Sequence, residues 1–178
     1  MKLYHGNRVN LSYIDPAWMM NGNCQIGVGI YFTSRKETAL VYGPNVFVIE
    51  VDKKYLLPGM GMVGDHFSKS SVYRFLKELH DIDSTIMYNF LVDYGMDESV
   101  QHYIGNYVKS IKRIVEFLLY SEIRNFQLDI AERFGVINFV ICWNRIFSDV
   151  KGLRENRPGG EIWASIIDNS IQLRKEVP

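Results

Sequence analysis

The chain has 178 residues, with 20 basic and 20 acidic side chains and a formal net charge of zero. A chain of this length typically forms one domain. Its 47% hydrophobic and 22% charged residues are typical of a globular protein rather than a disordered, fibrous or membrane-embedded one. Zero net charge excludes a protein that coats nucleic acid through its overall field, although it leaves a local basic patch possible.

Cysteine usage and hydropathy indicate the compartment. Cys24 and Cys142 are too few for a disulfide framework or a cysteine zinc site. The first residues turn polar at once, unlike a secretory signal, and the apolar run at 136–143 is far too short to cross a bilayer. We therefore expect a cytoplasmic protein that uses no metal and does not associate with a membrane.

The first fifty residues read as short strands and turns. Residues 3–5 predict a brief strand, and residues 27–33 predict an apolar strand entered through two glycines. Ser34 and Glu37 match a capping box, which predicts a helix over 35–42 that ends at Gly43 and Pro44. Residues 46–52, rich in valine and isoleucine, predict another strand.

The middle of the chain has helical periodicity from 70 to 134. One segment places Val72, Phe75, Leu76 and Leu79 on a single face, and another begins near Asp97. The simplest interpretation of these apolar stripes is helix packing. The sequence thus predicts a helical insert of about 68–134.

Strands are predicted again near the end of the chain, at 136–143, 161–167 and 170–177, with a polar loop over 149–160. Strands, a helical block and strands again predict an α+β fold in which both ends of the chain join one sheet. We expect a single domain over 1–178 that contains the insert.

Three polar sites interrupt or end the predicted strands. His5 and Gly6 end the first strand, Tyr31 lies within the second, and Glu161 opens the late one. Taken singly, they fit a surface histidine, a half-buried tyrosine and an edge glutamate.

Together these segments resemble a known family. Leu3-Tyr4-His5-Gly6, Gly29-Ile30-Tyr31-Phe32-Thr33 and Glu161-Ile162-Trp163-Ala164 resemble the His-Tyr-Glu signature of the ADP-ribosyltransferases related to diphtheria toxin and poly(ADP-ribose) polymerases. Residues 34–42 resemble the family's short helix with a second tyrosine, here Tyr42. The resemblance covers 2–52 and 158–177, implies a split β-sheet core of ADP-ribosyltransferase type, and leaves the helical insert unexplained.

The resemblance implies roles for six residues in binding and cleaving NAD, which is a substrate here. Glu161, His5 and Tyr31 would be catalytic; His5, Gly6, Tyr31, Thr38 and Tyr42 would bind NAD. His5 would hold a ribose hydroxyl, the Gly6 backbone and Thr38 the carboxamide, and Tyr31 and Tyr42 the nicotinamide ring. Glu161 would hold the ribose 2′-hydroxyl. Asn7 and Gly159 depart from the family pattern, and Gly159 removes the paired acid of its arginine-modifying branch.

These residue types suit cleavage of an N-glycosidic bond. Such a reaction passes through an oxocarbenium-like state that a carboxylate stabilises. Aromatic faces attract a pyridinium ring by about 0.5–2 kcal/mol each, and a glycine allows the close approach of backbone groups.

The resemblance predicts a mono-ADP-ribosyltransferase similar to bacterial or phage effectors and toxins. A protein side chain is the first candidate acceptor and nucleic acid the second. Alternatives are an NAD glycohydrolase, a tRNA 2′-phosphotransferase-like enzyme, or an inactive binding module on the same fold. Against the phosphotransferase, Arg8 is the only arginine near the first motif.

Overall fold

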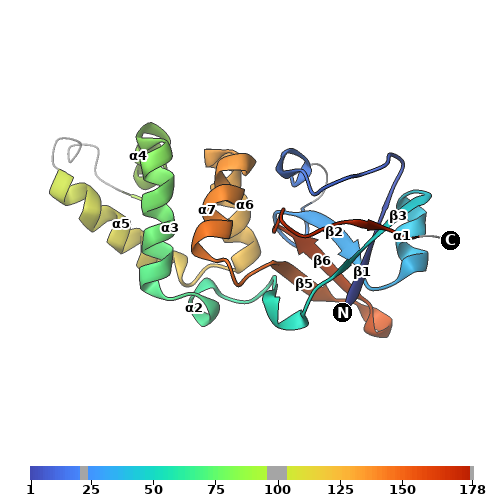
Figure 1. The fold of residues 1–178 in the computed structure, drawn as a ribbon. Helices are drawn as coiled ribbons and strands as arrows, with labels where there is room; N and C mark the ends of the chain where they lie inside the picture. Colours follow the sequence, from blue (N-terminus) through green and yellow to red (C-terminus); the bar gives the residue numbers. More distant parts are fainter. Residues whose placement is uncertain (21–23, 96–103, 177–178) are drawn as a thin grey trace. The chain divides into compact units, whose positions relative to one another are not determined.

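The structure, a computed structural model, describes residues 1–20, 24–95 and 104–176. The chain divides into two compact units, one formed by Met1–Gly59 with Ser148–Pro178 and the other by Met60–Phe147. The first unit contains the sheet and the second is helical (Figure 1). The α+β fold class predicted from the sequence is confirmed. The helical unit extends beyond the predicted insert of 68–134 at both ends.

The sheet of the first unit has the strand order β4-β5-β6-β2-β1-β3-β7 among the described residues. Its neighbouring strands pair antiparallel, except that β4 and β5 are parallel. The strands are β1 (Lys2–Asn7), β2 (Ile30–Thr33), β3 (Asn45–Glu50), β4 (Leu56–Pro58), β5 (Gly152–Asn156), β6 (Ile162–Ile166) and β7 (Arg174–Lys175). Helix α1 (Lys36–Tyr42) follows β2, and short 3-10 turns occur at Pro16–Trp18, Lys53–Tyr55 and Pro158–Gly160.

Side-chain alternation along the central strands separates the two faces of the sheet. One face carries the fully buried side chains of Leu3, Phe32, Phe47, Ile49, Ala164 and Ile166. The opposite face carries Tyr4, Gly6, Thr33 and Trp163, which alternate with them. Helix α1 packs on that opposite face, since a Cβ on Gly6 would meet the Ala39 carbonyl.

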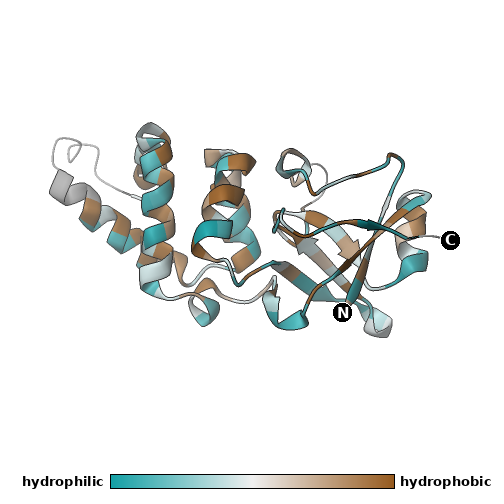
Figure 2. Cartoon of the chain, viewed as in Figure 1, coloured by the Kyte–Doolittle hydropathy of each residue, from teal (hydrophilic) through white to brown (hydrophobic). Residues whose placement is uncertain are grey.

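The helical unit consists of α2 (Val63–His66), α3 (Lys69–Ile82), α4 (Ser84–Asp93), α5 (Ile104–Leu118), α6 (Ile123–Phe134) and α7 (Val136–Ile146) in its described part. Figure 2 shows hydrophobic and hydrophilic residues alternating along these helices, as expected for amphipathic packing. Its core is an aromatic cluster of Phe67, Phe75, Phe126, Phe139, Trp143 and Phe147. The helix predicted to begin near Asp97 lies outside the described residues. No helix in the part of the chain that the structure describes is long and apolar enough to cross a membrane.

The predicted strand at 136–143 is wrong, because this segment forms helix α7. Periodicity cannot separate a short apolar run in a strand from one in a buried helix. Here Phe139, Val140 and Trp143 are buried, while Ile137 and Ile141 are 53% and 47% exposed. That pattern is helical, and Gly135, with φ 82°, marks the break from α6.

The end of the chain also differs from the prediction. The segment 149–160, predicted to be a loop, contains β5, which pairs with β4 on one side and β6 on the other. The strand predicted at 170–177 is limited to Arg174 and Lys175 in the described residues. Ser34 is not the cap of α1: Arg35 occupies the N-cap position without a side-chain cap hydrogen bond. The Ser34 hydroxyl accepts a hydrogen bond from the Ile162 N–H instead.

Candidate functional site

Strands that are far apart in the sequence lie side by side at the centre of the sheet. The order β6-β2-β1 brings together the strands that carry Tyr31 and His5 and the strand that Glu161 precedes (Figure 1). The register pairs Tyr4 with Thr33, and Thr33 with Trp163. The three predicted motifs therefore meet in one region of the first unit.

The pairing of β1 with β2 stops early. In these fully described strands, Tyr4 and Thr33 are the one registered pair, whereas β1 pairs with β3 through six positions. At the next residue of β1, the side chain rather than the backbone contacts β2. The His5 Nδ1 lies 2.7 Å from the Tyr31 carbonyl oxygen. Two cavities border this place, and His5, Tyr31 and Phe32 line both of them.

The smaller cavity, of about 100 Å³, contains four of the predicted site residues in its wall. The wall is made by Tyr4, His5, Gly6, Tyr31, Phe32, Thr33, Ala39, Tyr42 and Trp163. Glu161 and Thr38 are not in the wall. Glu161 contacts it through Thr33, whose Oγ1 donates a 2.5 Å hydrogen bond to the Glu161 Oε1.

His5 is held as a neutral imidazole with a defined tautomer. A carbonyl oxygen only accepts hydrogen bonds, so Nδ1 carries the proton toward Tyr31 and Nε2 is left as an acceptor. The Asn7 side-chain amide lies 3.4 Å from Nε2. Burial lowers the pKa of His5, an effect that the bond to the Tyr31 carbonyl partly offsets. The neutral ring can therefore donate a hydrogen bond through Nδ1 and accept one through Nε2.

The Tyr31 ring is fixed by its hydroxyl group. The hydroxyl accepts from the Ile26 N–H and donates to the Gly27 carbonyl, both at 3.0 Å. Burial raises the pKa of Tyr31 to about 12, so the side chain is uncharged at neutral pH. A ring anchored at its polar end presents a rigid aromatic wall to both cavities.

Tyr42 lines the smaller cavity and is partly open to solvent. Its side chain is 56% exposed and contacts Trp163 edge to face, with ring centroids 5.8 Å apart. The predicted pair, Tyr31 and Tyr42, thus lines one cavity.

Gly6 has a structural requirement that the sequence argument did not foresee. A Cβ at this position would lie 1.7 Å from the Ala39 carbonyl oxygen and 2.6 Å from its carbon. The backbone of helix α1 therefore approaches β1 too closely for any other residue. Packing of the helix requires this glycine, whether or not its backbone also contacts a ligand.

Glu161 is an ionised carboxylate in a network of donors. The pKa of Glu161 is lowered chiefly by the Thr33 hydrogen bond, against the opposing effect of burial. Hydrogen bonds from Thr38 and Trp163 and the charge of Arg35 contribute further. The predicted Thr38 thus contacts the carboxylate. Thr33, only 3% exposed, was missed by the sequence analysis. A hydroxyl residue at the end of an otherwise apolar strand was the available signal.

The larger cavity, of about 650 Å³, extends from His5 and Tyr31 along the loop that follows β1. Tyr13 and Trp18 line it and are each 61% exposed. Exposed aromatic side chains beside a cavity are typical of a binding site.

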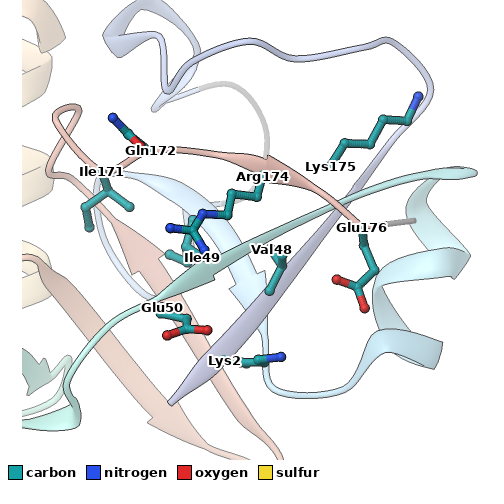
Figure 3. Close-up of a pocket in the computed structure, with 9 residues that line it drawn as sticks. All are labelled: Lys2, Val48, Ile49, Glu50, Ile171, Gln172, Arg174, Lys175 and Glu176. Carbon is teal, nitrogen blue, oxygen red and sulfur yellow. The ribbon is translucent and has the colours of Figure 1, made fainter. Parts of the chain in front are cut away.

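A third hollow, of about 600 Å³, lies against β3 and the edge strand β7 (Figure 3). Side chains of both charges line it, among them Lys2, Glu50, Arg174 and Glu176. Figure 3 shows Lys175 pointing away from the others. None of the predicted site residues line this third hollow.

Among the described residues, no group of three or more His, Cys, Asp or Glu side chains is placed to hold a metal ion. That the protein uses no metal stays a prediction.

Comparison with known proteins adds little. No protein-family model matches this chain, and no curated protein matches it. A crystal structure of an anti-CRISPR protein is similar with a TM-score of 0.35 and 13% sequence identity, covering 99% of this chain and 95% of that one. Similarity at this level carries no argument about function.

Proposed function

We propose that this protein is a mono-ADP-ribosyltransferase, which cleaves NAD at the nicotinamide N-glycosidic bond and transfers ADP-ribose to a macromolecule. One observation carries the proposal. His5, Tyr31 and Glu161, expected to act together from the resemblance alone, come from three neighbouring segments around the place where β1 and β2 stop pairing. An arrangement of unrelated surface residues would have no reason to converge there.

The two cavities support a position for NAD. The smaller one takes the nicotinamide ring between Tyr31 and Tyr42, beside the Gly6 backbone. The larger one shares His5 and Tyr31 with it and takes the rest of the dinucleotide, with Tyr13 and Trp18 available to stack on adenine. His5 lines both cavities and would hold a ribose hydroxyl.

The chemistry follows from the charge of Glu161. The C1′–N bond breaks and its electron pair leaves with nicotinamide, which is released neutral. The Glu161 carboxylate, ionised at neutral pH, stabilises the positive charge that develops on the ribose. An acceptor nucleophile then bonds to C1′ and loses its proton. A protein side chain is the acceptor we propose first and nucleic acid second.

The proposal places the reaction in the cytoplasm, where NAD is available.

Incubation with labelled NAD and a cell lysate tests the proposal. We expect the wild-type protein to label a macromolecule, and Glu161→Ala to label none. Loss of the labelled band after protease treatment identifies a protein acceptor, whereas loss after nuclease treatment identifies nucleic acid. Free labelled ADP-ribose without a labelled acceptor would make the protein an NAD glycohydrolase. Equal labelling by the two proteins, or no NAD cleavage by either, would refute the proposal.

A further inference from the structure

Glu161 lies in the hairpin that joins β5 to β6. It follows the turn at Pro158–Gly160 and precedes the first residue of β6. Gly159 and Gly160 both have positive φ, at 74° and 75°. Within the hairpin, a 2.7 Å bond from the Arg157 N–H to the Glu161 carbonyl closes the turn. The direction of the Glu161 carboxylate therefore depends on its side-chain partners, which are Thr33, Thr38 and Trp163.

Thr33, the last residue of β2, and the two residues that follow it make several contacts with the Glu161 segment. Besides the Thr33 bond to the carboxylate, the Ser34 Oγ accepts from the Ile162 N–H at 2.9 Å. The Ser34 N–H in turn donates to the Ile162 carbonyl at 2.8 Å. The Arg35 Nη2 donates to the Gly159 carbonyl at 2.5 Å. We call Thr33, Ser34 and Arg35 the 33–35 clamp.

The Thr33 hydroxyl is itself oriented. Its oxygen accepts from the Arg35 N–H at 3.2 Å, so its proton is directed to Glu161. Thr33 is almost fully buried, whereas the Glu161 side chain that accepts this bond is partly exposed to solvent. The charge of Arg35 also lowers the pKa of Glu161. On the same hairpin, Arg157 is paired with Glu155, with an Nη2–Oε2 distance of 2.9 Å.

We propose that the 33–35 clamp positions Glu161 for catalysis: Thr33 orients the carboxylate, and Ser34 and Arg35 fix the backbone on either side of it. The inference rests on the proposed function, because it assigns positioning residues to the same site. Preorganised groups of this kind raise the rate of the chemical step more than they raise substrate affinity.

Matched variants separate positioning from folding. Thr33→Val removes the hydroxyl at nearly constant shape, and Thr33→Ser keeps it. Arg35→Ala removes the contact with Gly159, and Arg157→Ala, on the same hairpin, is its control. Two properties are measured for each protein: the pKa of Glu161 by NMR of its side-chain carboxyl, and kcat and KM for NAD cleavage.

We expect the pKa of Glu161 to rise toward its ordinary value in Thr33→Val and to stay near the wild-type value in Thr33→Ser. We expect kcat to fall about tenfold to hundredfold in Thr33→Val, with KM for NAD changed by less than about threefold, since hydrogen bonds to charged groups are strong. Arg35→Ala should also raise the pKa of Glu161 and lower kcat about tenfold. Arg157→Ala should keep the wild-type values.

An unchanged Glu161 pKa in Thr33→Val overturns the clamp, as does a loss of activity in Arg157→Ala equal to that in Arg35→Ala. The pKa measurement needs no enzymatic activity. If wild-type protein cleaves no NAD, the proposed function fails, and the pKa comparison still decides whether Thr33 holds the Glu161 carboxylate.

Discussion

Replacing Gly6 with alanine tests whether this glycine serves the fold. The added methyl group would lie 1.7 Å from the Ala39 carbonyl oxygen, and real Cβ contacts essentially never fall under 3.0 Å. Helix α1 must therefore move away from β1 by about 1.3 Å, from 1.7 to 3.0 Å. The two nearest atoms belong to the α1 backbone, which cannot rotate away as a flexible side chain does.

The expected cost follows from this displacement. Overpacking by a methyl group typically costs 1–3 kcal/mol, and a backbone clash places Gly6→Ala near the upper end, at about 3 kcal/mol. In a chain of this length, that loss lowers Tm by about 6–12 °C. Gly160→Ala is the control in the same unit, because its methyl meets nothing within 4 Å and only its φ of 75° is strained. It should cost about 1 kcal/mol, and Tm should fall by about 2–4 °C.

Thermal unfolding followed by circular dichroism, without NAD, measures both effects. A Gly6→Ala protein that melts within about 2 °C of wild type would refute the packing argument. If that variant also failed to cleave NAD, the glycine would serve ligand binding alone.

Three further predictions concern the first unit. Tyr31→Phe removes the hydroxyl that bonds to the Ile26 N–H and the Gly27 carbonyl. Chemical denaturation should show a free energy of unfolding that is lower by about 1–3 kcal/mol, and wild-type stability would contradict a structural role for the hydroxyl. Lys151→Met removes the cation 2.7 Å from Asp168, which is 5% exposed. We expect the free energy of unfolding at pH 7 to fall by about 2 kcal/mol, and an unchanged value would mean that the ion pair is not formed. Burial would raise the pKa of Asp168, but bonds from Lys151 and Ser170 outweigh it and lower the pKa. Its contribution to stability is therefore present above about pH 4 and lost as pH falls below that, and Asp168→Asn should flatten this part of a pH–stability profile.

Local patterns were sufficient for the parts of the fold that depend on neighbouring residues. The strands around His5, Tyr31 and Val48 and the helix ending at Tyr42 combine strand or helix periodicity with clear turn signals. Strand β5 was missed because Arg154 and Glu155 read as loop residues, and its pairing with β4 joins segments almost a hundred residues apart. No pattern within 149–160 contains that information.

In the candidate site, too, the sequence indicates the residues but not their long-range contacts. Sequence resemblance identified His5, Tyr31 and Glu161, but the contacts that set their properties are long-range. Thr33 and Glu161 are separated by 128 positions, and Arg35 and Gly159 by 124. A hydroxyl and a guanidinium next to a predicted helix start read locally as caps or solvated groups, so their function was recognisable only in the folded chain.

The rate of nicotinamide release from NAD tests the central claim most directly. Purified wild-type protein, Glu161→Gln and Glu155→Gln are compared, with Glu155 as a neighbouring carboxylate that is paired with Arg157. We expect wild-type protein to release nicotinamide, and Glu155→Gln to release it at a rate within about threefold of wild type. Glu161→Gln should release it about 10²–10³-fold more slowly than wild type. Release by Glu161→Gln at the wild-type rate, or no release by wild type, would contradict the account.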